Sequence, residues 1–170
     1  MLFRSELAGA ALAGQIDAAL AAPPPAPGLA RLVRMLGMTS NEAARPVLRR
    51  VLEHAESAES AESAEATAAA LDALWHPDDA HWARSGAVHA QWFVRVAAAK
   101  ALARLGVAED CRPLTVLLSD TSWWVRYRAA QALARLPGMT REELLRMRES
   151  AGDRYAADML GQVISEQAAP

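Results

Sequence analysis

The side chains best suited to bind a metal ion lie close together between His76 and His81. Asp78 and Asp79 fall between these two histidines, so imidazole and carboxylate groups lie together within one short segment. Zinc is commonly held by such groups in a tetrahedral site. Adjacent carboxylates at the start of a helix also complement the positive end of the helix dipole without any metal. This second explanation is simpler, and we predict no metal and no cofactor.

Groups that could act in catalysis are present, but no familiar motif arranges them. The sequence contains no nucleophile elbow and no glycine-rich phosphate loop. Its single cysteine, Cys111, excludes an internal disulfide and a cysteine zinc site. We therefore predict no catalytic residues and a protein that is not an enzyme.

Basic side chains are concentrated in one half of the chain. Residues 84–148 carry eleven Lys and Arg against five Asp and Glu, whereas the whole chain has a net charge of −2. A helical period places several of them on one side of consecutive helices. Such a face favours an anionic partner, such as phosphate groups or an acidic protein surface, although a merely solvated face is the alternative. The candidate partner-binding residues are Lys100, Arg104, Trp124, Arg128, Gln131 and Arg135.

Aromatic residues next to this basic group allow a different interpretation. Trp123 and Trp124 stand beside Arg126 and Arg128, and aromatic rings next to arginine can stack on nucleic-acid bases. However, Trp92 and Trp123 occupy equivalent positions of a repeat, which favours packing between repeats. A nucleic-acid binder is also usually basic throughout. Nucleic acid is therefore not the partner we expect.

An internal repeat organises these residues. Residues 91–106 align with residues 122–137 without a gap at a shift of 31. Such a period indicates one supersecondary unit stacked on copies of itself. In the second copy the apolar residues recur as on one face of a helix. They are Val125, Ala129, Ala132, Leu133 and Leu136.

A shorter helix precedes each copy. Pro113 suits the first turn of a helix, and Leu114, Leu117 and Leu118 follow it as a short apolar stripe. The unit is thus a short helix A, a tight turn, a longer helix B and a loop. No alternating pattern suggests a strand. The predicted fold is an all-α, right-handed α-solenoid (superhelix) of about five antiparallel helix pairs, forming a single domain over residues 1–170.

The repeat resembles the HEAT repeat, in the short bacterial form grouped with phycobilin-lyase-type repeats. The resemblance rests on Asp120 in the turn, on Val125-Arg126 opening helix B, and on the Ala-Leu pairs that follow. It covers residues 79–136 and extends over 137–167. The resemblance implies that Arg95, Asp120 and Arg126 form an inter-repeat ladder.

The same resemblance implies a function. HEAT-like proteins typically act as non-catalytic scaffolds that present helix B to another protein, and some bacterial ones belong to membrane-associated assemblies. Two alternatives remain open on the same resemblance. One is a bilin lyase or isomerase-like enzyme, and the other is a nucleic-acid binder or repeat-type DNA glycosylase.

The remaining segments are predicted from their proline and turn residues and from their composition. Residues 1–78 read as degenerate repeats, with helices expected at 2–22, 29–37 and 45–54 and a proline spacer at 23–27. The Ala-Glu-Ser run near 55–66 is predicted to be a mobile acidic insertion, with a helix following from Thr67 to Trp75. Residues 79–136 hold two clear repeats, and 137–170 form a terminal capping repeat.

No apolar run reaches the roughly 20 residues that a membrane span needs. The N-terminal segment is also a poor signal peptide. We expect a cytoplasmic monomer. The opening Met-Leu-Phe-Arg suggests that the native protein continues upstream, so that this chain is a C-terminal portion and a preceding region provides any membrane association.

Overall fold

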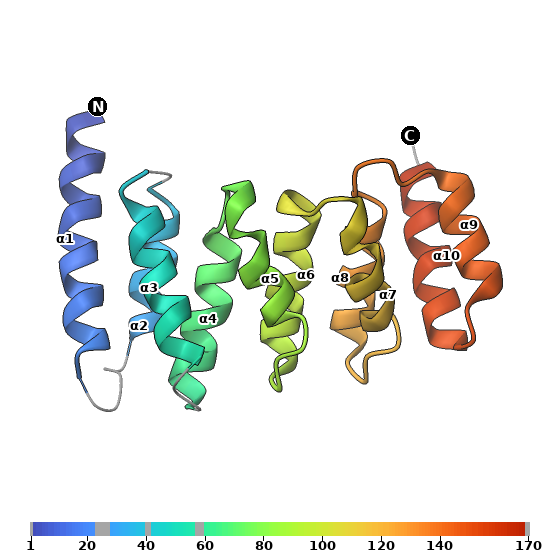
Figure 1. The fold of residues 1–170 in the computed structure, drawn as a ribbon, viewed down its shortest axis with the longest axis horizontal. Helices are drawn as coiled ribbons and strands as arrows, with labels where there is room; N and C mark the ends of the chain where they lie inside the picture. The colour runs from blue at the N-terminus through green and yellow to red at the C-terminus, as the bar shows by residue number, and fades with distance from the viewer. Residues whose placement is uncertain (1, 23–27, 40–41, 57–59, 169–170) are drawn as a thin grey trace. The chain divides into compact units, whose positions relative to one another are not determined.

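The computed structural model describes residues 2–22, 28–39, 42–56 and 60–168. Within these ranges the regular structure consists of ten α-helices and two short 3-10 helices, and no strand occurs. The chain divides into two compact units, Met1–Leu74 and Trp75–Pro170. Each unit is a stack of helix pairs (Figure 1).

Four helices form the first unit: α1 (Leu2–Leu20), α2 (Leu29–Gly37), α3 (Ala44–Glu56) and α4 (Ala61–Ala73). Helix α1 pairs with α2, α3 pairs with α4, and α2 packs along α4. A Cβ atom built on Gly37 would lie only 2.7 Å from the Cβ of Ala73. The α2–α4 contact therefore depends on small residues that let the two backbones approach closely.

The predicted acidic insertion near 55–66 is wrong for residues 61–66, which form the first half of α4. Ser60 caps the helix, since its Oγ accepts from the Ser63 N–H at 3.0 Å. Ala64 and Ala66 are buried. The physical reason is that small side chains in this low-complexity run can pack against a neighbouring helix, while Glu65 stays exposed. Residues 57–59, and the predicted spacer at 23–27, lie outside the described residues.

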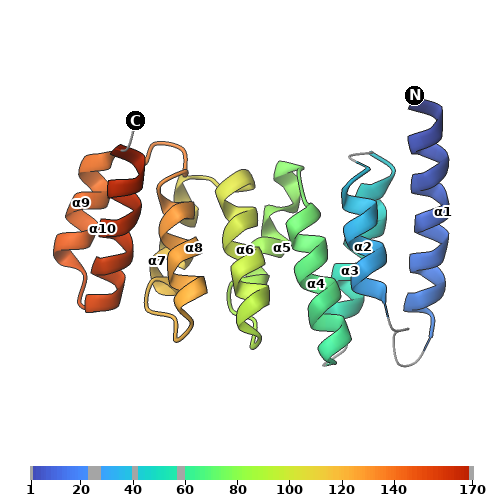
Figure 2. The same cartoon turned by 180° about the vertical axis from the view of Figure 1, so that it is seen from behind.

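The second unit contains η1 (Pro77–Asp79), α5 (Ala80–Gly86), α6 (Trp92–Leu105), η2 (Ala108–Asp110), α7 (Cys111–Leu117), α8 (Trp123–Leu133), α9 (Arg141–Ser150) and α10 (Arg154–Ala168). Helix α5 packs on α6, α7 on α8, and α9 on α10. Helix α8 also contacts both α6 and α10, so these three longer helices form a continuous layer. Figures 1 and 2 show the unit from opposite sides.

The buried faces of this unit follow the sequence repeat. Val94, Leu102, Val125 and Leu133 are all 0% exposed. The same register continues into α10, where Leu160 occupies the position of Ala129 and is 1% exposed. The prediction of an all-α solenoid built from helix pairs is confirmed, with five pairs among the described residues.

The last helix pair has a polar exterior. Helix α9 begins with a capping box, in which Thr140 and Glu143 each bond the other's backbone N–H. The hydrogen bond from the Thr140 backbone holds the pKa of Glu143 below its usual range. Of the ten residues of α9, only Leu144 is buried. A polar outer face is the property that a terminal repeat needs.

Candidate protein-binding face

One side of α8 combines an exposed tryptophan with polar and basic groups. Trp124, Arg128, Gln131 and Arg135 follow one another at helical spacing, opposite the buried residues of the same helix. Trp124 is 53% exposed. Arg128 donates from Nη1 to Oε1 of Gln131 at 2.7 Å, and Arg135 lies exposed just after the helix ends. These four residues are called the α8 face below.

The neighbouring aromatic rings form a cluster at the start of α8. Trp123 meets Trp124 edge-on with centroids 4.8 Å apart and stacks on Tyr127 with centroids 5.1 Å apart. The guanidinium of Arg128 lies 5.8 Å from the Tyr127 ring centre. Edge-to-face, stacked and cation–π contacts thus stabilise the arrangement of the aromatic side chains next to Trp124.

The repeat pattern favoured packing of Trp92 and Trp123 between repeats, but both side chains are exposed. Their side chains remain 45% and 42% exposed. Each stands two residues before a buried valine, Val94 or Val125, and two residues turn a helix by about 200°. The rings therefore point away from the core. Equivalence between two repeats does not tell whether a tryptophan is buried or exposed, because equivalent residues can be both buried or both exposed.

Helix α6 contributes the remaining predicted binding residues. Arg104 is exposed and donates from Nη1 to the Lys100 carbonyl at 3.1 Å, whereas Lys100 is half-buried. Because α6 packs directly against α8, these cations belong to the same helix layer as the α8 face. All six predicted binding residues thus come from two adjacent helices and the turn that follows α8.

A cavity of about 180 Å³ lies between α8 and α10, beside the α8 face. Glu166 of α10 lines it and accepts a hydrogen bond from the Tyr127 hydroxyl at 3.1 Å. Burial, followed by this bond, raises the pKa of Tyr127. Sequence reasoning missed both residues, although the four-residue spacing of Trp123 and Tyr127 signals a stacked pair.

An ion pair joins α6 to the turn before α8. Arg95 donates from Nε and Nη2 to the two carboxylate oxygens of Asp120, at 2.6 and 2.8 Å. Its Nη1 donates to the carbonyls of His89 and Ala90. Burial would raise the pKa of Asp120, but bonds from Arg95 and the Ser122 N–H outweigh it, so the pKa lies below its usual range. This pair is the ladder contact that the family resemblance implied.

A second ion pair, between the exposed Arg84 and a buried aspartate, was not anticipated from the sequence. Asp110 is 2% exposed and receives bonds from Arg84 Nε at 2.6 Å and Nη2 at 3.1 Å. It also accepts from the Val107 N–H at 2.9 Å. Burial pushes its pKa up, yet these donors together bring it below the usual range. The available signal was Asp79, which precedes Asp110 by one repeat and is likewise buried.

Arg126 does not continue the ladder into the last helix pair. Its Nη1 donates to the carbonyls of Asp120 and Thr121, as Arg95 does one repeat earlier. Its Nε is buried and has no hydrogen-bond partner in the described part of the chain. The reason is a change of residue, because Ala151 stands where the repeat of 31 would place the next Asp.

The family model of HEAT repeats matches residues 56–134 and 88–157. Together these matches cover more than half of the chain. The chain belongs to the HEAT-repeat family. Helices α5, α7 and α9 are therefore the A helices of this unit, and α6, α8 and α10 are its B helices. A search of curated proteins gave no match.

Other candidate sites in this HEAT protein have structural explanations. His76 accepts the Asp78 N–H at 3.3 Å and caps η1, and His81 Nδ1 lies 2.9 Å from the Asp78 carbonyl. The described residues include no group of three or more potential metal ligands. Among the helices described, none combines the length and apolar character required to cross a bilayer.

Proposed function

We propose that this HEAT-repeat protein is a non-catalytic scaffold that binds another protein through the α8 face, together with Lys100 and Arg104 of α6. The observation that carries the proposal is the exposed Trp124 beside Arg128 on a helix whose opposite side is fully packed. Trp and Arg are the residues that most often dominate the energy of protein interfaces. The basic side chains favour an acidic partner surface.

The exposed aromatic groups support burial by a partner. Trp124 and Trp123 leave about half of their surfaces in water, and apolar area gains about 25 cal/mol per Å² when it is buried. The Arg128–Gln131 bond fixes one polar neighbour before binding, which lowers the entropy lost on association. A partner thus meets a partly preorganised surface.

The alternatives receive less support. A bilin-sized ligand needs a pocket of about 300–1,000 Å³, and neither the cavity beside the α9–α10 loop, of about 210 Å³, nor the one between α8 and α10, of about 180 Å³, reaches that size. A nucleic-acid backbone would meet Glu166 next to the α8 face, bonded to Tyr127. A carboxylate there repels phosphate but tolerates a partner protein that brings its own cation.

Charge reversal tests the proposed face. We expect the wild-type protein, immobilised and incubated with extract of its native cell, to retain a protein that the double variant Arg128→Glu/Arg135→Glu does not retain. The matched control is Arg112→Glu/Arg146→Glu, which makes the same charge change at exposed positions of the A helices α7 and α9. The retained protein is then purified and its affinity for all three forms is measured by calorimetry.

The comparison of the three affinities decides whether the partner binds at the α8 face. Loss of binding in the α8-face variant but not in the control supports the proposed site. Equal affinity for all three forms refutes the α8 face. A salt-dependent gel shift with DNA or RNA, without any retained protein, would favour the nucleic-acid alternative.

A further inference from the structure

The joint between the α7–α8 turn and the α9–α10 loop lacks one rung of the arginine–aspartate ladder. Asp120 satisfies both Nε and Nη2 of Arg95 from the following repeat. Arg126 is held in the same way as Arg95 by two turn carbonyls, at 2.7 and 3.2 Å. By analogy with Arg95, the Nε and Nη2 groups of Arg126 are the donors for which the last helix pair would supply a carboxylate.

The repeat register identifies the residue that fails to supply it. Helix α10 begins at Arg154, which follows Trp123 at the start of α8 by 31 residues. Ala151 consequently occupies the position of Asp120, and its methyl group accepts no hydrogen bond. Arg126 Nε is left buried without an acceptor among the described residues. An unpaired buried donor of a charged group carries a substantial desolvation cost.

The carboxylate that the α9–α10 loop does contain is engaged elsewhere. Asp153 uses Oδ1 to accept the Tyr155 N–H at 2.9 Å, at the start of α10. The ring of Tyr155 lies 5.0 Å from the guanidinium carbon of Arg126 and covers one face of the group. Nε and Nη2 lie at the edge of the guanidinium plane, which is the side that a carboxylate grips. Tyr155 is 62% exposed, so its side chain can rotate without disturbing the core.

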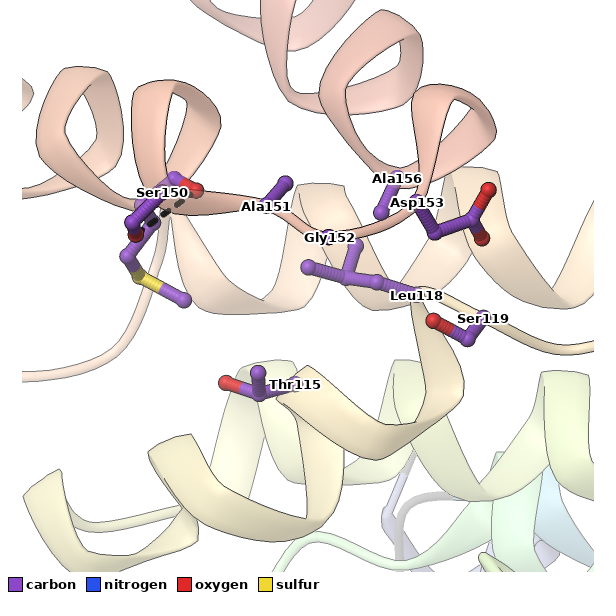
Figure 3. Close-up of a pocket in the computed structure, with 9 residues that line it drawn as sticks. Thr115, Leu118, Ser119, Ser150, Ala151, Gly152, Asp153 and Ala156 are labelled. Atoms are coloured by element: carbon purple, nitrogen blue, oxygen red, sulfur yellow. Dashed lines mark hydrogen bonds between the residues drawn. The ribbon is translucent and has the colours of Figure 1, made fainter.

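A cavity of about 210 Å³ opens at this joint. Figure 3 shows the α9–α10 loop with Ala151, Gly152 and Asp153 above Leu118 and Ser119. Ser119 directly precedes Asp120, whose carbonyl holds Arg126. Ala151 lines this cavity, which is large enough for a carboxylate side chain, whereas Arg126 is not among its lining residues.

We propose that this joint binds the side-chain carboxylate of an Asp or Glu in an acidic segment of a partner protein. The carboxylate completes the ladder by pairing with Arg126 as Asp120 pairs with Arg95. The site uses none of the residues of the α8 face. It can therefore exist whether or not that face binds a protein.

The arginine Nε–H signals of the 15N-labelled full chain report on this pairing directly. Arg126→Lys identifies the Arg126 signal, and the signal of Arg95 serves as the internal example of a bidentate pair. The probes are a short end-blocked peptide with one Asp among Gly and Ser, its Asn counterpart, and sodium acetate. We expect the Asp peptide to move the Arg126 signal toward the position of Arg95, and the Asn peptide to leave it in place.

The substitution Ala151→Asp restores the rung from within the chain. We expect its Arg126 signal to lie near that of Arg95 without any peptide, and its affinity for the Asp peptide to fall about tenfold or more. Ser165→Asp adds the same charge at an exposed position of α10 and should bind the peptide like the wild type. Acetate acting as strongly as the peptide would show that free carboxylates also use the site.

Three results would overturn the proposal. One is an Arg126 signal that does not respond to millimolar Asp peptide. Another is unchanged peptide binding by the Ala151→Asp variant. The third is a wild-type Arg126 signal that already resembles that of Arg95 and moves when Asp153 is changed to Asn, because Asp153 would then complete the ladder itself.

Discussion

At the scale of single residues, arginine–aspartate pairs with buried carboxylates join successive repeats. Arg95 and Asp120 are 14% and 8% exposed at their side chains, so water screens this pair little. Replacing one partner leaves the other as an uncompensated buried charge. The pair therefore matters most when one half of it is removed.

We predict that Asp120→Ala lowers the free energy of unfolding by about 3 kcal/mol. Arg95 then loses both carboxylate bonds, and the Ser122 N–H loses its acceptor. Urea denaturation followed by tryptophan fluorescence measures the change. Thr121→Ala, which alters an exposed neighbouring side chain, should stay within about 0.5 kcal/mol of the wild type. Equal stability of both variants would rule out this role for the pair.

Acid should weaken the second unit through Asp110 and Asp120. Both have folded-state pKa values below the usual range because arginine and backbone donors outweigh burial. Their contribution is complete above the unfolded-state pKa of about 3.9. It disappears as the pH falls from there through the lower folded-state values, because the unfolded chain takes up protons first.

The variant Asp110→Asn tests whether stability falls in this direction with pH. It cannot be protonated, so it should be less stable than the wild type at pH 7 and lose less further stability on going to pH 3. Denaturation curves at both pH values give the comparison. Glu109→Gln, at the exposed adjacent position, should keep the wild-type dependence. A steeper loss in Asp110→Asn than in the wild type would contradict the assignment.

At the scale of elements, helices with a clear apolar period could be predicted from the sequence. The start of α4 and an ion pair between two helices could not. The apolar period of α8 placed Val125 and Leu133 on the buried face, and both are fully buried. Residues 61–66 were misread because a repeated tripeptide has no apolar stripe, although its alanines suit a close helix contact. The Arg84–Asp110 pair joins residues from different helices and requires the fold to be known.

Leu133 lies on the buried face of α8 and is 0% exposed. Leu133→Ala should destabilise the second unit by about 2–5 kcal/mol, because a cavity forms and apolar contacts are lost. All five tryptophans lie within Trp75–Pro170, so the fluorescence transition follows this unit. A midpoint close to that of the wild type would mean that the site collapses around the smaller side chain.

The side-chain cap that Ser60 provides allows a test of stability in the first unit. Ser60→Ala removes the side-chain cap of α4 and should cost about 1 kcal/mol. The loss should appear in the helical circular dichroism signal and leave the tryptophan transition unchanged. Ser60→Asp retains a capping oxygen and serves as the control. An unaltered dichroism transition in Ser60→Ala would indicate that packing alone fixes the start of α4.

At the scale of the whole molecule, the repeat register separates the buried positions from those that face outward. Within each B helix the same positions are buried, as Ala98, Ala129 and Leu160 show. The outer positions are not restricted to apolar residues, as Lys100, Gln131 and Gln162 show. The sequence could therefore predict the fold and the side of the helix that faces water. It could not predict the partner, because the repeat pattern encodes packing and carries no information about what the outer face meets.

Photo-crosslinking from the α8 face tests the scaffold proposal most directly. Benzoylphenylalanine is placed at Trp124 of the full chain in its native cell, and the control probe is placed at Val116, which is 68% exposed on the A helix α7. We predict a protein cross-link from position 124 that position 116 does not give, and that Arg128→Glu/Arg135→Glu abolishes. The same cross-link from both positions, or one from position 116 alone, would contradict a partner bound to the α8 face.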